Sequence, residues 1–566
     1  MPAWNRVIAL VLAALAGCGG GGGGSPPAPV DGKVLDDPTV YSSQADASLS
    51  GAEEAAAVTR HTLTLGGRTL AYTATAGHLI ARHVDTGDAQ ASLFYVAYTL
   101  DGASAVARPV TFFYNGGPGS ASAWLQLGSF GPKRLVTGVP ATTAARPFPL
   151  VDNADSLLAS TDLVFVNAVG TGRSEAIAPF RNRSFWGVDS DAALFRDFIL
   201  RWLEVNGRAR SPKFLYGESY GGARTAVLAR RLQDAGVTLD GLVLQSPALD
   251  YNSNCGVNGL PTSSCAGYLP SLAAVGAWHG RTNPVPTDLD AWLAGAEDLT
   301  VRAYAPALDA WLGAGTPAPA LWQPLSDLTG WPLSGWQAQF NVGPTPYREG
   351  LLSGQLLGRY DGRMAAPVGS ALAAEGDPSS TWVGDSFARA IDSHLSGDLG
   401  YRNASTYVML GSAIRFWDFS HAGRALPDTV PDLAAALAQN PALRVLAVSG
   451  VHDLATPYFV TETDLARLGS DRVAVRHYPG GHMSYLDDGT RPRQQADLAA
   501  FVADALALRA ADEARRGPLA LPPRWARGAA VDRAGTVQRP GQVAPAREPA
   551  FQAPLRDPWI PAAPPR

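Results

Sequence analysis

Gly217-Glu218-Ser219-Tyr220-Gly221-Gly222 is the most informative stretch of this chain. It has the Gly-x-Ser-x-Gly form of a nucleophile elbow, a sharp turn that lifts a serine hydroxyl from the end of a strand onto the start of a helix. Residues 213–216 before it form a strand-like run, and residues 223–232 after it are rich in Ala, Leu and Arg, which favours a helix. Small residues let the backbone take such a turn. An ordinary glycine-rich turn is the competing interpretation.

A nucleophilic serine needs a base, and the base needs an acid that orients it. In proteins with this elbow the chain order is serine, acid, histidine. Six histidines follow Ser219, and His482 is the one on a glycine-rich loop after a strand-like run, residues 473–478. Asp453 follows a second such run, residues 443–449. Ligand sites of open α/β sheets form beyond strand ends. We therefore predict Ser219 as nucleophile, Asp453 as acid and His482 as base.

Five other residues compete for the two partner roles, namely His452, His477, Asp464, Asp487 and Asp488. His477 falls inside a strand pattern and Asp464 inside a helix pattern, so a structural role is expected for both. His452 adjoins Asp453 and is expected to be a loop residue without a catalytic role. The two aspartates after His482 follow it too closely to support its ring from behind.

A glycine-rich loop supplies the electrostatic part of the site. Residues 109–114 form a strand-like run that leads into Asn115-Gly116-Gly117-Pro118-Gly119-Ser120. Acyl transfer needs N–H donors aimed at the developing oxyanion, and such a loop leaves backbone N–H groups free to serve. One donor usually comes from this loop and the other from the residue after the nucleophile, which predicts the amides of Gly117 and Tyr220. A common Asn-Gly turn is the alternative.

Taken together, the motifs resemble the serine carboxypeptidases, a family of acid-active carboxypeptidases. The matching stretches follow the family's order and span about residues 60 to 510; they are residues 115–120, 169–174, 217–222, 449–457 and 480–482. The resemblance implies an α/β-hydrolase fold, with a mainly parallel central sheet flanked by helices and a helical cap inserted into it. It also implies a peptide substrate and no metal or organic cofactor.

The resemblance further implies that Asn115, Gly116 and Glu218 bind the substrate's C-terminal carboxylate. A glutamate can do so only if the two carboxyl groups share a proton, because two negative charges in contact cannot both stay ionised. Such a pair titrates jointly. The chain departs from the family pattern at Ser129, where a second glutamate is usual, and at Ser120, where a cysteine is usual. We therefore expect a weaker acid preference than the family shows and a looser demand for a free C-terminus.

The N-terminus predicts export. Arg6 precedes an apolar run over residues 7–16, which is too short for a bilayer span of about 20 residues and is typical of a signal peptide. Leu15-Ala16-Gly17-Cys18 resembles a bacterial lipobox, in which Cys18 becomes the lipid-bearing N-terminus. This predicts a protein anchored in the bacterial cell envelope, with membrane contact only through the lipid. A secretory signal cut near the following glycines is the alternative.

Two further cysteines, Cys255 and Cys265, flank a polar loop. In an oxidising compartment this pair is expected to form a disulfide. Two cysteines in this arrangement do not indicate a metal site.

Composition and pattern suggest a domain layout. The 566-residue chain is 46% hydrophobic and 17% charged, enough to bury a large core. Its net charge of −5, without a basic stripe, indicates no nucleic-acid partner. We predict a signal peptide at 1–18, a flexible tether at 19–57, a first core segment at 58–252, the helical cap at 253–415, a second core segment at 416–516, and an extended or disordered tail at 517–566.

The cap segment is rich in tryptophan. Trp278, Trp292, Trp311 and Trp322 could line a pocket for an apolar side chain or belong to the cap's own core.

The sequence thus predicts a serine carboxypeptidase that releases C-terminal residues through an acyl-enzyme intermediate. An esterase or acyltransferase on the same scaffold is the nearest alternative, and a binding protein without catalytic activity is a third.

Overall fold

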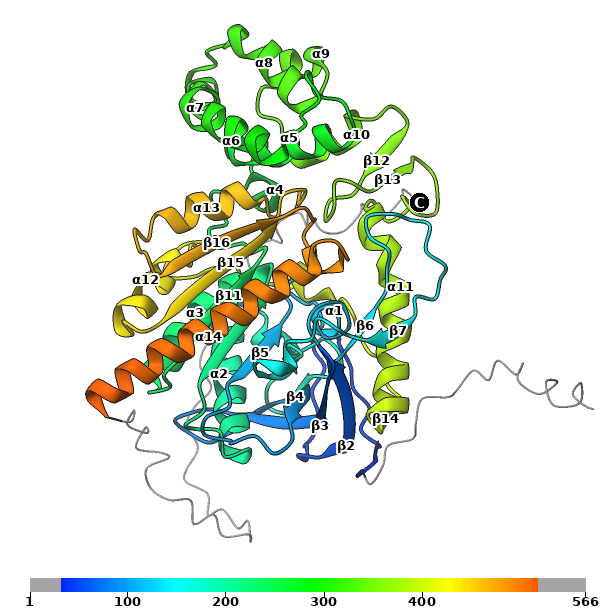
Figure 1. The fold of residues 1–566 in the computed structure, drawn as a ribbon, viewed down its shortest axis with the longest axis vertical. Coiled ribbons are helices and arrows are strands. Elements are labelled where there is room, and N and C mark those ends of the chain that lie inside the picture. Colours follow the sequence, from blue (N-terminus) through cyan, green and yellow to red (C-terminus); the bar gives the residue numbers. More distant parts are fainter. Residues whose placement is uncertain (1–31, 518–566) are drawn as a thin grey trace, which may run out of the picture.

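The computed structural model describes residues 32–517, and a ten-stranded sheet forms its centre (Figure 1). Nine strands follow one another across the sheet in the order β16 (Val473–Tyr478), β15 (Arg444–Gly450), β11 (Gly241–Gln245), β10 (Lys213–Glu218), β5 (Val110–Tyr114), β8 (Asp162–Val166), β4 (Ala89–Leu100), β3 (Arg68–Arg82) and β2 (Ala56–Leu65), with β9 (Glu175–Ala176) paired to β4. Neighbours from β16 to β8 are parallel, and those from β8 to β2 are antiparallel. This is the predicted α/β-hydrolase fold, which is thereby confirmed.

Both faces of the parallel half are covered by helices, and the strands alternate between two cores. On β5, Phe112 and Tyr114 point into one apolar cluster and Phe113 into the other. The first cluster lies under α2 (Val188–Val205), α3 (Tyr220–Asp234) and α12 (Val430–Gln439). The second lies under α1 (Ala123–Gly128), α11 (Pro378–Ser393) and α14 (Arg491–Arg516). Burial on both sides explains why these strands read as nearly unbroken apolar runs.

A group of helices forms the cap beyond one end of the sheet (Figure 1). Its members are α5 (Leu269–Trp278), α6 (Leu289–Leu299), α7 (Ala305–Ala314), α8 (Pro319–Thr329), α9 (Leu333–Ala338) and α10 (Pro344–Gly350). They enclose an apolar cluster of their own, against which Trp292, Trp311 and Trp322 pack. Three of the four tryptophans therefore belong to the cap's core, whereas Trp278 is 52% exposed.

The cap is shorter than predicted. Trp382, Phe387 and Ile391 of α11 join the core cluster that contains α1, so this part of the predicted 253–415 segment packs on the hydrolase core. The apolar face of α11 therefore packs on the strand-bearing body, and not on the helices of the cap.

Smaller elements complete the described chain. The short strands are β1 (Leu35–Asp37), β6 (Lys133–Leu135), β7 (Leu150–Asp152), β12 (Gln355–Leu357), β13 (Ala365–Pro367) and β14 (Tyr401–Asn403). The remaining α-helices are α4 (Cys255–Asn258) and α13 (Tyr458–Ala466). Single turns of 3-10 or π-helix are η1 (Leu157–Ala159), η2 (Asn182–Phe185), η3 (Ala266–Tyr268), η4 (Thr300–Tyr304), η5 (His394–Asp398), η6 (Ser412–Phe416) and η7 (Ser484–Leu486).

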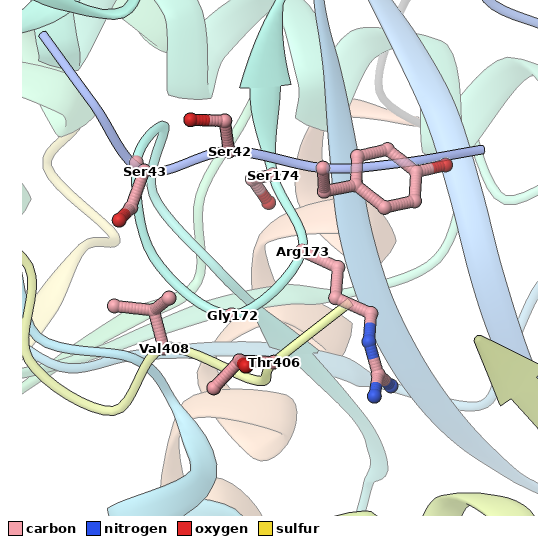
Figure 2. A pocket seen from close by; sticks show the side chains of 9 residues that line it. Ser42, Ser43, Gly172, Arg173, Ser174, Thr406 and Val408 are labelled. Atoms are coloured by element: carbon pink, nitrogen blue, oxygen red, sulfur yellow. The ribbon is translucent and has the colours of Figure 1, made fainter. Parts of the chain in front are cut away.

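The prediction of a flexible tether through residue 57 is wrong for residues 33–57. Strand β1 pairs with β14, and the backbone N–H of Tyr41 donates to Ser405 Oγ at 2.8 Å. Figure 2 shows Ser42 and Ser43 beside the loop of Gly172, Arg173 and Ser174, where they line a small pocket. Partners far away in the sequence therefore fix a segment whose composition alone suggests a linker. The predicted signal peptide with Cys18, the tether up to residue 31 and the tail beyond Gly517 lie outside the described residues.

The predicted disulfide is confirmed. Cys255 and Cys265 are bonded, with their Cα atoms 5.3 Å apart. Across residues 32–517, no helix has both the length and the apolar character needed to cross a membrane.

Candidate active site

Ser219 stands at a strained turn between a strand and a helix. Strand β10 ends at Glu218, α3 begins at Tyr220, and Ser219 between them has φ 64° and ψ −125°. A non-glycine residue in such a conformation costs about 1–3 kcal/mol and is typical of functional sites. A Cβ atom on Gly217 would lie 2.1 Å from the carbonyl oxygen of Gly221. Gly217 is thus required for close approach of the backbone, and the positive φ falls on the serine itself.

Asp453 and His482 meet on neighbouring loops. They follow β15 and β16, which are parallel neighbours in the sheet. Asp453 Oδ2 lies 2.8 Å from His482 Nδ1. A hydrogen bond at Nδ1 orients the ring and leaves Nε2 as the nitrogen that can serve a serine hydroxyl.

Thr456 completes the polar surroundings of this pair, and sequence reasoning missed it. Its hydroxyl lies 2.9 Å from Asp453 Oδ2 and 3.0 Å from His482 Nδ1. The other carboxylate oxygen of Asp453 accepts the backbone N–H groups of Ala455 and Thr456 at 2.7 and 3.1 Å. Burial by itself lowers the pKa of His482, but the Asp453 carboxylate outweighs burial and raises the pKa above its ordinary value.

A segment of the insertion braces both loops. The N–H of His482 donates to the carbonyl of Tyr360 at 2.6 Å, and the N–H of Leu454 donates to the carbonyl of Arg359 at 3.0 Å. The ring of Tyr360 lies 4.9 Å from that of His482, centre to centre. Residues 359–363 therefore hold the loops of Asp453 and His482 in place, although no motif in the sequence marks them.

The glycine loop lies against the elbow. A Cβ atom on Gly116 would lie 2.5 Å from the amide nitrogen of Tyr220, so only glycine permits this approach. The buried guanidinium of Arg224 donates to the carbonyl of Asn115 at 2.6 Å and pairs with Asp191, also at 2.6 Å. These contacts fix the loop that contains Gly117 beside the first residue of α3. The two amides predicted as oxyanion donors thus belong to adjoining backbone segments.

Glu218 is buried beside Ser219 with a hydrogen bond at each oxygen. Asn115 Nδ2 donates to Oε1 and the Tyr485 hydroxyl donates to Oε2, both at 2.6 Å. Only 4% of Glu218 is exposed. Burial raises its pKa to about 7, against the opposing effects of His482 and of the two hydrogen bonds. The structure therefore brings Asn115 and Glu218 together as predicted and adds Tyr485, which sequence reasoning missed.

Ser129 takes no part in this arrangement. Its hydroxyl donates to the carbonyl of Leu125 at 2.6 Å, within the last turn of α1. The same helix fixes Asn115, because the N–H of Leu125 donates to Asn115 Oδ1 at 3.2 Å. The position where a second glutamate is expected thus stabilises a helix end.

The competing residues lie in other surroundings. His452 stacks edge-on against Trp278, and His477 packs on Tyr458. Asp464 accepts a hydrogen bond from Ser253, while Asp487 and Asp488 pair with arginines, Arg363 and Arg134. In the part of the chain that the structure describes, no three or more His, Cys, Asp or Glu side chains gather as a metal site would require.

The fold is that of an α/β hydrolase, and the site combines a serine at a strand-to-helix turn with a hydrogen-bonded Asp–His pair. Residues 68–258 match the family model of the serine carboxypeptidases, so the resemblance inferred from the motifs is confirmed for the segment that holds the glycine loop and the elbow. Asp453 and His482 lie outside the matched residues. The match supports peptidase or esterase activity.

Comparison with solved structures finds similar folds at low sequence identity. A prohormone-processing carboxypeptidase from Saccharomyces cerevisiae is 16% identical, with 76% of this chain and 91% of that chain covered and a TM-score of 0.47. The proline iminopeptidase of Mycobacterium smegmatis is 16% identical, with 76% and 99% covered and a TM-score of 0.34. An esterase from Thermogutta terrifontis is 12% identical, with 76% and 98% covered and a TM-score of 0.32. No curated protein matches the chain.

Proposed function

We propose that this protein is a serine-type carboxypeptidase that releases single residues from the C-termini of peptides. The observation that supports this proposal is Glu218, a buried acid that directly precedes Ser219 and is hydrogen-bonded by Asn115. A residue of extended chain spans only about 3.5 Å. A carboxylate held by Glu218 would therefore place the last peptide bond, and not an internal one, at the Ser219 hydroxyl.

In the first half of the reaction, Ser219 Oγ attacks the carbonyl carbon of the last peptide bond while His482 Nε2 takes the hydroxyl proton. The Asp453 carboxylate stabilises the resulting imidazolium through its hydrogen bond to Nδ1. The amides of Gly117 and Tyr220 stabilise the oxyanion. His482 then returns the proton to the departing amine, the C–N bond breaks, and the acyl group stays on Ser219.

In the second half, water attacks the acyl-enzyme and His482 takes a proton from it. The ester bond to Ser219 breaks, the proton passes to Ser219 Oγ, and the shortened peptide leaves with a new carboxylate. The cycle consumes one water and needs neither a metal nor an organic cofactor.

The pH dependence has two opposing limbs. The base must be neutral, so activity rises as pH increases through the pKa of His482, which lies above its ordinary value. Glu218 must be protonated to share a proton with the substrate carboxylate, so binding is lost as pH rises through about 7. A maximum between weakly acidic and neutral pH follows.

Location is proposed from the N-terminus. Lipid attached at Cys18 would anchor the protein in the bacterial cell envelope, an oxidising setting that suits the Cys255–Cys265 disulfide. Replacing Cys18 with Ala should move the protein from the membrane to the soluble fraction, and retention in the membrane would contradict the lipid anchor.

The activity is tested by labelling with a fluorophosphonate and by a panel of blocked dipeptides, their amides and simple esters. We expect labelling that Ser219→Ala abolishes, together with cleavage of the dipeptides. Labelling with cleavage of esters alone would favour an esterase or acyltransferase, and absence of labelling would favour a binding protein.

A further inference from the structure

Tyr485 follows His482 by three residues, in the 3-10 turn η7, and has its hydroxyl on Glu218. The distance from the hydroxyl to Glu218 Oε2 is 2.6 Å, and the tyrosine is fully buried. Within residues 32–517, this is the single hydrogen bond of the Tyr485 hydroxyl. It crosses from the His482 loop to the end of β10 and so joins the two halves of the site.

The ring of Tyr485 fills space beside the end of α1. A Cβ atom on Gly128 would lie 3.0 Å from Tyr485 Cε2, so the ring packs against the residue that precedes Ser129. The small side chain of Ser129 turns back to the carbonyl of Leu125. Arg491 holds the carbonyls of Gly128 and Ser129, both at 2.6 Å, and thereby fixes this helix end. The Tyr485 ring thus packs against the helix end whose last turn leads into Ser129, the position where the resembling family has its second glutamate.

A phenol in place of a second glutamate changes which group can accept the Glu218 proton. Both partners of Glu218, Asn115 Nδ2 and the Tyr485 hydroxyl, act as donors. A second glutamate could accept the proton of Glu218, whereas two donors leave that proton available to a third group. Burial and the Glu218 charge raise the pKa of Tyr485 well above 10, so the phenol stays a donor over the working range.

The other ionisable groups near Glu218 are few. Those that face it or sense its charge are His482, Asp453, Tyr485, Tyr216 and Tyr360. Asp453 is already satisfied by His482, Thr456 and two backbone amides, so it offers no site for the Glu218 proton. The three tyrosines have raised pKa values because they are buried.

We propose that Tyr485 is the positioning residue for Glu218 in carboxylate recognition: it replaces a second glutamate by a fixed donor, and it directs the single Glu218 proton to the C-terminal carboxylate of the substrate. This inference rests on the proposed carboxypeptidase function. It predicts that binding of the substrate carboxylate depends on a single proton, that of Glu218, and not on a proton shared between two glutamates.

The test replaces Tyr485 with Phe, which removes only the hydroxyl. Loss of one hydrogen bond to a buried acid corresponds to a change of about tenfold. At about pH 6, below the alkaline limb, where Glu218 is protonated in both enzymes, we expect KM for a blocked dipeptide with a free C-terminus to rise about tenfold. The kcat should stay within about twofold, once active enzyme is counted by fluorophosphonate labelling. Cleavage of a blocked amino acid p-nitrophenyl ester, which lacks the carboxylate, should keep its kcat/KM.

The pH profile supplies a second readout. If the role of Tyr485 were merely structural, its loss would leave the position of the alkaline limb unchanged. Tyr485 stabilises ionised Glu218, so its loss should move the alkaline limb for the dipeptide to higher pH. When Tyr485→Phe is added to the Glu218→Gln variant, the alkaline limb should not move, because a glutamine side chain does not titrate. Tyr304→Phe is the matched control: it also removes one buried hydroxyl with one hydrogen bond, to the carbonyl of Phe340 in the cap, and should alter neither KM nor the limb.

The outcomes separate this inference from the proposed function. Dipeptide cleavage with KM and alkaline limb unmoved in Tyr485→Phe, or equal losses for dipeptide and ester, would overturn the role of Tyr485 alone. Ester cleavage without dipeptide cleavage by the unmodified enzyme would overturn both. If Tyr485→Phe does not fold, the unmodified enzyme decides: a slope of about −1 in log kcat/KM above the limb supports one proton, and about −2 overturns it.

Discussion

The two sides of the active site are held together in different ways. The elbow side, residues 115–120 and 217–222, consists of backbone segments that touch directly, as the 2.5 Å approach between a Cβ on Gly116 and the Tyr220 nitrogen shows. The two segments of the loop side, residues 450–456 and 479–484, also touch directly, since a Cβ on Gly450 would lie 2.1 Å from the carbonyl oxygen of Gly481. Residues 359–363 of the insertion add a further support, through backbone hydrogen bonds, that the elbow side does not have. The elbow side positions the nucleophile and the amides that stabilise the oxyanion. The loop side positions the base, and it depends in part on the inserted segment.

The largest expected effect lies on the loop side. Asp453→Asn should lower kcat by about 10,000-fold, because the amide favours the wrong tautomer of His482 while the geometry is kept. Steady-state kinetics with the dipeptide and the ester measure it, and both substrates should be affected alike.

Asp464→Asn is the matched control for that change. Asp464 is also buried, on α13, but it bonds Ser253 and the backbone of Asp250, and not His482. If Asp464→Asn lowered kcat by a comparable factor, the loss of any buried carboxylate would be enough to reduce activity. That result would contradict the assignment of Asp453 as the acid that orients His482.

A pair of glycine substitutions compares the rigidity of the two sides. Gly116→Ala places a Cβ 2.5 Å from Tyr220 N and 2.6 Å from Glu218 O, the backbone atoms on either side of the nucleophile. Gly481→Ala places one 2.2 Å from the carbonyl of Tyr360, in the inserted segment. We expect kcat to fall about 100-fold for the first and about tenfold for the second, since misplacing a catalytic group by about 1 Å costs about 100-fold.

Thermal unfolding of the two variants is the accompanying measurement. Both should remain folded at the assay temperature, with serine labelling slowed more in Gly116→Ala. Equal losses, or a larger loss in Gly481→Ala, would contradict the view that the elbow side is the more rigid.

The smallest effect on activity is expected at the disulfide, away from both sides. The Cys255–Cys265 bond closes a loop of ten residues in sequence separation, which corresponds to about 2–3 kcal/mol of stabilisation at most. The double substitution Cys255→Ser with Cys265→Ser should lower the unfolding free energy by up to this amount in denaturant titration. The kcat for the ester should change less than about twofold, and a larger change would link the bond to the site.

The sequence predicts the elbow side better than the loop side for a physical reason. The turn at Ser219 and the glycine loop are each made by a few consecutive residues, so local pattern reveals them. The pairing of Asp453 with His482 is predictable from sequence because both residues follow strands that are neighbours in this fold. Residues 359–363 carry no such pattern, and their contacts exist only after the insertion has folded back onto the core.

The same limit explains two other results. Tyr485 and Glu218 are 267 residues apart, so their hydrogen bond has no local signature. The segment of residues 33–57 reads as a linker by composition, yet Tyr41 is fixed by Ser405, 364 residues away. Hydrogen bonds between residues this far apart in the sequence fix the segment of Tyr41 and the surroundings of Glu218. A single sequence carries no local pattern that reveals them.

The most direct test of the central claim, recognition of the C-terminal carboxylate by Glu218, compares a blocked dipeptide with its C-terminal amide. At pH 6, where Glu218 is protonated, we predict that kcat/KM for the free acid exceeds that for the amide by about 100-fold. Cleavage of the amide should still be measurable, because Ser129 stands where a second glutamate would tighten the demand for a free C-terminus. Above about pH 7 the preference should fall by about tenfold per pH unit as Glu218 ionises. Equal rates at pH 6, or a preference that stays constant from pH 6 to 9, would contradict the account.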